Sequence, residues 1–151
     1  MRTLILALLG AVLLAAPAAA QLPQDDPDPS IEDGSAQAAL TAAKDRWAAT
    51  GLRSYRFRVA VTCFCPASFR RPATVTVRRG RPVHPPDRVR AIATVPRLFA
   101  KVQAAIDQRV ARLDVAYGRR GVPRSIAIDV SRMIADEERG YTARHLKPLE
   151  P

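Results

Sequence analysis

The sequence has 151 residues, 48% of them hydrophobic, with 24 lysines and arginines against 14 acidic residues and a formal net charge of +10. A chain of this length is expected to form one ordinary domain, which excludes two large ones. Five acids and no base lie between Gln21 and Ala43, so the remainder is strongly basic. A basic body favours anionic partners, although an Arg-rich coding bias would give the same composition without any binding function.

The N-terminal residues have the pattern of a secretory signal peptide. Arg2 precedes an apolar run from Leu4 to Ala16, and small residues precede Gln21. The run is shorter than the roughly 20 residues that a membrane-spanning helix needs. We therefore expect residues 1–20 to be removed and the protein to be exported, as a periplasmic or secreted protein. No Cys follows the run to carry a lipid anchor, and no transmembrane segment is expected after cleavage.

The mature chain is expected to begin with a linker and a helix. Residues 21–34 are acidic, rich in Pro and poor in apolar side chains, which predicts disorder. Residues 35–147 are expected to form a single α+β domain, followed by a frayed tail at residues 148–151. The first helix is predicted from Ser35 to just before Gly51. Its apolar stripe consists of Ala36, Leu40, Ala43 and Trp47, with Trp47 expected to anchor the helix onto a sheet.

Three strands are predicted after this helix. Residues 54–62 alternate apolar and polar side chains with a period of two, and residues 74–78 do the same. The Arg79-Gly80 dipeptide favours a turn into a return strand at residues 81–84. Proline residues in and after that strand withhold backbone donors, so it is expected to be short and at a sheet edge, with a loop at residues 85–90.

The second half of the domain repeats this order of elements. A helix is predicted from a Thr94 cap to near Arg109, and strands at residues 113–117, 125–130 and 141–146. The apolar face of the helix is expected to hold Leu98, Phe99, Val102, Ala105 and Ile106. The order α-β-β-β-α-β-β-β with short connections favours an antiparallel sheet of about six strands, with both helices on one face and the other face solvated.

The solvated face is the first candidate binding site. Four arginines fall on the polar phase of their strands, namely Arg56, Arg58, Arg78 and Arg144. If they share one face, their charges would bind an anionic polymer or a lipid headgroup, and salt would weaken that binding. Outside the cytoplasm such partners are more common than nucleic acid, which we do not expect as a partner.

The second candidate site is Cys63-Phe64-Cys65, which holds both cysteines of the chain at the end of a strand. Three interpretations are open: a disulfide, a dithiolate for a soft metal such as copper, and two unlinked thiols. In an extended strand the two Cα atoms would lie about 6.5–7 Å apart, so a disulfide needs a bent backbone. Bridging positions so close in sequence would add little stability.

The sequence contains none of the familiar catalytic signatures and indicates no cofactor or metal site. The densest acidic group of the basic body is Asp136, Glu137 and Glu138, with Asp129 on the preceding strand. These carboxylates would suit acid–base chemistry or a hard cation, but we favour a solvated loop that balances nearby arginines, because surface ion pairs are common. A small extracytoplasmic hydrolase or cation-dependent enzyme would gather them with His or Arg in a concave pocket.

A series of short motifs gives the chain a family resemblance. The motifs are Trp47, Ser54-Tyr55-Arg56-Phe57-Arg58, Cys63-Phe64-Cys65-Pro66, Val75-Thr76-Val77-Arg78-Arg79-Gly80, Leu98-Phe99, Tyr117 with Gly121-Val122-Pro123, Ile128-Asp129 and Asp136-Glu137-Glu138. In this order they resemble the bacterial domain of unknown function 6174 over residues 40–146. The resemblance implies an exported protein, and it assigns no catalytic residue. Together these features predict a non-enzymatic module of the cell envelope that binds an envelope component or another protein.

Overall fold

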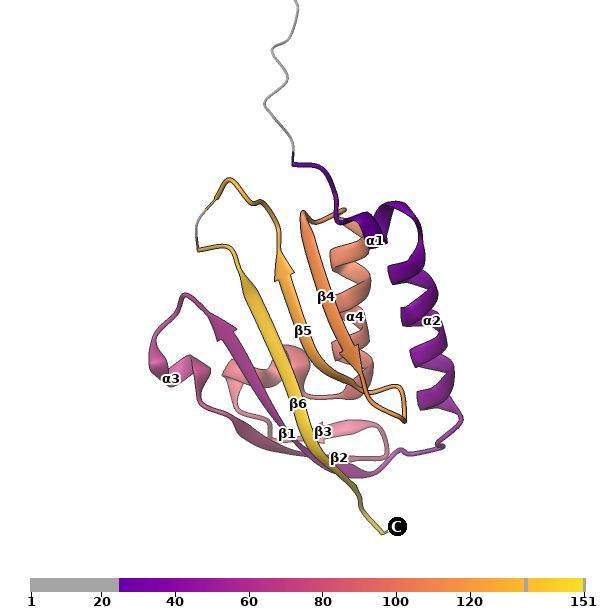
Figure 1. The fold of residues 1–151 in the computed structure, drawn as a ribbon. Coiled ribbons are helices and arrows are strands. Elements are labelled where there is room, and N and C mark those ends of the chain that lie inside the picture. The colour runs from indigo at the N-terminus through magenta and orange to yellow at the C-terminus, as the bar shows by residue number, and fades with distance from the viewer. Residues whose placement is uncertain (1–24, 135, 151) are drawn as a thin grey trace, which may run out of the picture.

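Six antiparallel strands form one open sheet in the computed structural model, which describes residues 25–134 and 136–150. The strand order is β3-β2-β1-β6-β5-β4. The strands are β1 (Tyr55–Cys63), β2 (Ala73–Arg78), β3 (Arg81–Val83), β4 (Arg112–Tyr117), β5 (Pro123–Asp129) and β6 (Arg139–Pro148). Two long helices, α2 (Ser35–Ala48) and α4 (Val95–Asp107), lie side by side on one face of this sheet (Figure 1). The predicted fold class and order of the main elements are confirmed, whereas the predicted signal peptide lies outside the described residues.

The hydrophobic core lies between the two helices and the apolar phase of the strands. Tyr55, Phe57 and Val59 alternate along β1 and are all buried, which is the period-two pattern of a half-buried strand. Helix α2 buries Leu40 completely, and burial of a side chain of this size contributes about 1.5–3 kcal/mol. Trp47 packs edge-on against Tyr55, with 5.3 Å between ring centroids, so it anchors α2 onto the sheet as expected.

Helix α4 is fixed to the sheet at its N-terminus. The Thr94 hydroxyl accepts a hydrogen bond from the Arg97 N–H at 3.3 Å, which confirms the predicted cap. The Val95 N–H, which has no partner within the helix, donates to the Tyr55 hydroxyl at 3.0 Å. Burial raises the pKa of Tyr55, although this hydrogen bond opposes the shift. The Tyr55 side chain thus contacts both long helices, α2 through the ring of Trp47 and α4 through the N–H of Val95.

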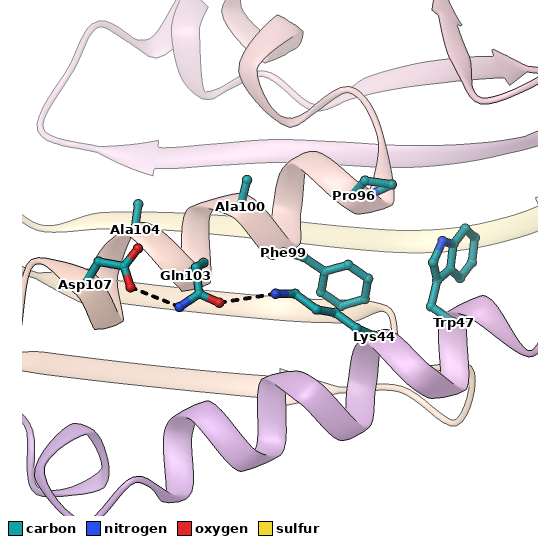
Figure 2. Close-up of a pocket in the computed structure, with 8 residues that line it drawn as sticks. All are labelled: Lys44, Trp47, Pro96, Phe99, Ala100, Gln103, Ala104 and Asp107. Carbon is teal, nitrogen blue, oxygen red and sulfur yellow. Dashed lines mark hydrogen bonds between the residues drawn. The ribbon is translucent and has the colours of Figure 1, made fainter.

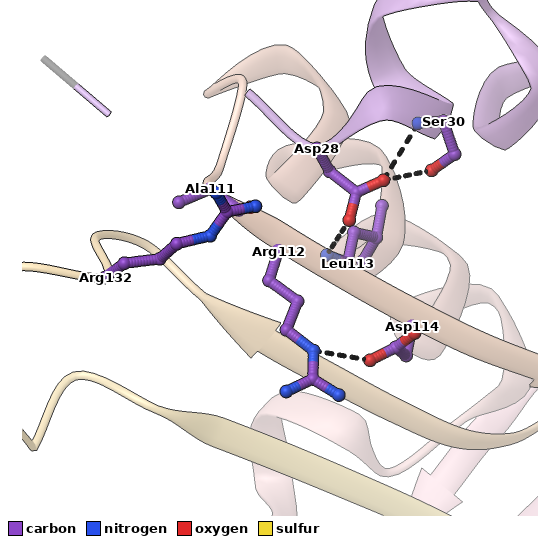
Figure 3. Close-up of polar contacts among 7 residues, drawn as sticks. All are labelled: Asp28, Ser30, Ala111, Arg112, Leu113, Asp114 and Arg132. Carbon is purple, nitrogen blue, oxygen red and sulfur yellow. Dashed lines mark hydrogen bonds and ion pairs between the residues drawn. The ribbon is translucent and has the colours of Figure 1, made fainter. Parts of the chain in front are cut away.

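The structure differs from the sequence prediction between residues 25 and 34, where we expected a disordered linker. A short helix, α1 (Pro29–Glu32), begins after Asp28. The Asp28 N–H donates to the Val110 carbonyl, and the Asp28 carboxylate accepts from the Leu113 N–H, both at 2.9 Å. Figure 3 shows this carboxylate between the Ser30 turn and the start of β4. The composition predicted disorder because it contains few apolar groups, but a single carboxylate bonds this segment to the sheet.

Two other short helices and a longer last strand also differ from the prediction. A short helix, α3 (Ala67–Arg70), follows the cysteine pair. A 3-10 helix, η1 (Asp87–Ile92), replaces most of the loop expected at residues 85–90 and buries Val89 and Ile92. Strand β6 extends into the expected tail as far as Pro148, and the Leu149 N–H donates to the Ser54 carbonyl at 3.0 Å. Helices of only four or six residues are too short to show a period in the sequence.

The connection between β4 and β5 packs tightly against α2. Gly121 in this connection has a φ of +79°, a conformation that favours glycine. A Cβ atom at this position would lie only 3.1 Å from the backbone nitrogen of Trp47, and it would overlap the backbone carbonyl of Ala43. Glycine is therefore required here both by its backbone conformation and by the closeness of the helix.

Candidate functional site

The solvated face of the sheet brings the predicted arginines together. In the pairing of β1 with β6, Arg58 lies opposite Arg144 and Arg56 lies opposite Lys147. Paired positions project from the same face, so these four cations form two adjacent cross-strand pairs. Arg78, at the end of β2, lies on the same face opposite Arg81 of β3. We call the set the basic face; it consists of Arg56, Arg58, Arg78, Arg81, Arg144 and Lys147, all of them exposed.

The charges of the basic face are not neutralised within the described part of the chain. The ion pairs of the described residues involve Arg90, Arg109 and Arg112, and these three arginines lie outside the basic face. Like charges directly opposite one another destabilise a strand pair, so the Arg58–Arg144 pairing costs stability. Neighbouring strands lie about 4.8 Å apart, and alternate residues along a strand about 6.6–7 Å apart, which gives a dense array of cations.

The sequence reasoning missed two members of the basic face. A strict period of two places Lys147 on the opposite phase from Arg144. The pairing of β1 with β6 shifts between Arg56 and Arg58, and His145 in β6 has a φ of +55°. This β-bulge adds one residue and returns Lys147 to the solvated face. Arg81 was missed because it directly follows the predicted turn, although it lies within the predicted return strand and pairs with Arg78.

The other half of the solvated face has a different character. Small side chains surround a shallow hollow of about 450 Å³ over β4, β5 and β6. Among them, Ala116 lies opposite Ser125, which in turn lies opposite Thr142. No helix covers either half of this face in the described ranges (Figure 1). The open face therefore presents an array of cations beside an accessible depression, in whose lining Asp114 is the one charged side chain.

Three of the four candidate carboxylates lie around a hollow at the end of the sheet. Asp129, Asp136 and Glu138 line this space of about 590 Å³ together with Arg112 and Arg139. The fourth carboxylate, that of Glu137, is not part of the lining. Within residues 25–134 and 136–150, no three His, Cys, Asp or Glu side chains are placed to hold a metal ion. The hollow gathers carboxylates with arginines, as an enzyme would, but the group does not form a metal centre.

The structure places the sulfur atoms of Cys63 and Cys65 in close contact, in the arrangement of a disulfide. Strand β1 ends at Cys63, and a bend at Phe64 shortens the distance between the two Cα atoms to 5.2 Å, within the usual range for disulfides. Neither cysteine belongs to the hydrophobic core. A hollow of about 320 Å³ lies against the disulfide and is lined by Cys63, Phe64, Cys65, Pro66 and Arg70.

An apolar groove of about 560 Å³ runs along the outer side of the two long helices. Trp47 and Phe99 contribute its aromatic part, as Figure 2 shows. Along one side, the Lys44 ammonium donates to the Gln103 side-chain oxygen at 3.2 Å, and the Gln103 amide donates to Asp107 at 3.0 Å. No sequence motif indicated this groove, because its lining comes from two helices far apart in the chain.

The fold and the basic face define a class of protein, namely a small α+β domain whose sheet keeps one cationic face open. A family model described as a family of unknown function (DUF6174) matches residues 39–148. The chain belongs to this family, in agreement with the resemblance of its motifs. No curated protein and no solved structure matches the chain. Among the described residues, no helix has the length and apolar character needed to cross a bilayer.

Proposed function

We propose that this protein is an exported, non-enzymatic module that binds an anionic polymer of the cell envelope on the open face of its sheet. The observation that carries the proposal is the like-charge pairing across β1 and β6, in which Arg58 faces Arg144 and Arg56 faces Lys147. Such pairing lowers the stability of the sheet unless an anion lies over it. A polyanion with closely spaced charges would neutralise several of these side chains at once.

The surroundings of the basic face favour a polymer over a membrane surface. Proteins that bind at a bilayer interface insert apolar side chains in addition to their charges. Among the described residues, Val83 is the one exposed large hydrophobic side chain on this half of the sheet face. Thr74 and Thr76 lie opposite Arg58 and Arg56, so hydroxyl groups alternate with the cations. Hydroxyl and guanidinium groups together suit the carboxylate and hydroxyl groups of an acidic polysaccharide.

Export is the part of the proposal that rests on the sequence. Arg2, the apolar run and the small residues before Gln21 support it. We expect the protein recovered from outside the cytoplasm to begin at Gln21, which mass spectrometry of its N-terminal peptide would show. A chain that keeps Met1 in the cytoplasmic fraction would contradict export.

The binding proposal is tested by charge reversal with a matched control. The variant Arg56→Glu/Arg144→Glu changes the basic face, whereas Arg119→Glu/Arg120→Glu makes the same change of net charge in the exposed β4–β5 connection. Alginate, a carboxylated polysaccharide, and vesicles containing phosphatidylglycerol serve as separate probes. We expect the first variant to bind alginate at least about tenfold more weakly, because each basic side chain near an anionic surface contributes about 1 kcal/mol.

The control variant should retain wild-type affinity for alginate within about twofold, because its charges lie off the basic face. Equal losses in the two variants would mean that only net charge matters and would overturn the assignment to this face. Binding to vesicles without binding to alginate would mean that the partner of the basic face is a lipid headgroup and not a polymer. Melting temperatures of both variants verify that each is folded.

The hollow at the end of the sheet favours a second candidate function, a small hydrolase whose carboxylates act as general acid and base. Its support is that Asp129, Asp136 and Glu138 line one space together with two arginines. If this candidate is correct, the wild type should hydrolyse members of a panel of chromogenic ester and glycoside substrates, and Asp129→Asn/Glu138→Gln should not. A wild type without activity on the whole panel would remove the hydrolase candidate.

A further inference from the structure

We propose that Cys63 and Cys65 form a dithiol–disulfide exchange site, which oxidises pairs of cysteine thiols in apolar segments of unfolded polypeptides. The site lies at the end of β1, outside the basic face, and the proposal does not depend on polymer binding. It rests on the position of the disulfide, on the apolar surface around it, and on the single charged side chain beside it.

The position of the disulfide allows it to be reduced and reformed without loss of the fold. Neither Cys63 nor Cys65 is part of the hydrophobic core. The two residues are only two positions apart, so their bond restricts the unfolded chain very little and contributes little to stability. A structural disulfide would instead join distant parts of the chain, and its reduction would be costly.

The surface around the disulfide suits an apolar polypeptide segment. Phe64 is 82% exposed between the two cysteines and lines the hollow that lies against them. Most of the exposed large hydrophobic side chains of the described residues belong to the two connections at this end of the sheet. They are Phe64 and Phe69 before β2, and Val130, Met133 and Ile134 before β6. Exposed apolar patches of this kind mark sites where other chains bind.

Arg70 is the one charged side chain among the residues that line the hollow. A cation near a cysteine favours its thiolate form, which is the leaving group when a disulfide is attacked. The spacing differs from the C-x-x-C motif, in which a helix N-terminus stabilises the thiolate. Here the guanidinium of Arg70 takes that role.

The exchange proceeds in two balanced steps. A thiolate of the substrate attacks one sulfur of the Cys63–Cys65 bond, forming a mixed disulfide and releasing the other cysteine as a thiolate. The second substrate thiolate then attacks the mixed disulfide, forming the substrate disulfide and releasing the remaining cysteine. The substrate dithiol loses two electrons, which the protein disulfide gains, and the two protons of the substrate thiols end on Cys63 and Cys65.

The test measures oxidation of synthetic peptides by the oxidised, full-length mature protein in the absence of oxygen. One peptide carries two cysteines flanked by Leu and Phe, and its matched control has Ser and Gln in place of these apolar residues. We expect one peptide disulfide to form for each protein disulfide lost, and the apolar peptide to react about tenfold faster, because it buries apolar surface on Phe64. Mass spectrometry after acid quenching should detect the mixed disulfide.

Three variants, one of which is a control, locate the effect. Phe64→Ala should remove the preference for the apolar peptide, while Val83→Ala, an exposed apolar residue on β3, should preserve it. Arg70→Gln should slow the reaction of both peptides about threefold to tenfold, because the leaving thiolate loses its cation. Equal rates for the two peptides with the wild type would overturn the proposal, as would free thiols in protein purified without reductant. Unchanged melting temperatures show that Phe64→Ala and Arg70→Gln act at the site and not on the fold.

Discussion

Asp28 shows how one side chain fixes a segment that its composition predicts to be disordered. Its carboxylate accepts hydrogen bonds from the N–H and hydroxyl of Ser30 and from the N–H of Leu113. Partial burial alone raises the pKa of Asp28, but these hydrogen bonds and the charge of Arg132 outweigh it, so its pKa lies below the ordinary 3.8. The hydrogen bonds between Asp28 and Ser30 follow from the local sequence, because Asp followed by Pro and Ser is typical of a helix start. The hydrogen bond from Leu113 could not be predicted from the sequence, because it depends on tertiary packing.

A lowered pKa in the folded state gives stability that is present above the pKa of the unfolded chain and is lost as the pH falls through the folded value. Asp28→Ala should therefore reduce the free energy of unfolding by about 1 kcal/mol at pH 6, the usual cost of losing a cap. Asp28→Asn keeps an acceptor oxygen and should lose less. For both variants, the difference from wild type should shrink as the pH falls below about 4 in urea titrations, because Asp28 is then protonated first in the unfolded chain and, at still lower pH, in the folded protein. A difference that stays constant from pH 6 to pH 3 would contradict the role of the charge.

At the scale of elements, the long periodic segments were predicted and the short or irregular ones were not. Helix α4 and strands β1 and β2 agree with the expected apolar phases, because each buries one face against a single core. Helix α3 and the 3-10 helix η1 span too few residues for a period to be recognised. The same reasoning explains the candidate site, where Arg56 and Arg58 follow the period of β1 while the bulge at His145 hid Lys147.

The β4–β5 connection offers a sharp test of packing with a matched control. Gly121 and Gly80 have nearly the same φ, +79° and +80°, so an Ala at either position has the same backbone strain of roughly 1–2 kcal/mol. A Cβ at Gly80 meets open space, whereas one at Gly121 meets the backbone of α2. Gly121→Ala should therefore destabilise the protein by about 1–3 kcal/mol more than Gly80→Ala, the usual cost of overpacking. Equal losses in chemical denaturation would show that the connection moves away from α2 at no cost.

At the scale of the whole molecule, the packed layer and the open face of the sheet differ in the kind of side chain that they carry. The helices and the apolar phase of the sheet form the core, so the side chains on the polar phase are not needed for core packing. The cations of the basic face lie on β1, β2, β3 and β6, while the other half of the sheet face combines small side chains of β4 and β5 with the Arg112–Asp114 ion pair. Net charge alone could not predict this separation, because it depends on strand order, and strand order is set by contacts between segments far apart in the chain.

The central claim, that the basic face binds a polyanion, is tested most directly by the salt dependence of alginate affinity. We expect the affinity of the wild type to fall by about tenfold or more between roughly 50 and 300 mM NaCl, since exposed charges are screened over this range. Arg56→Glu/Arg144→Glu should bind weakly at both concentrations and have a much shallower dependence, while Arg119→Glu/Arg120→Glu should follow the wild type. Parallel salt dependences for all three proteins would contradict a binding site on this face.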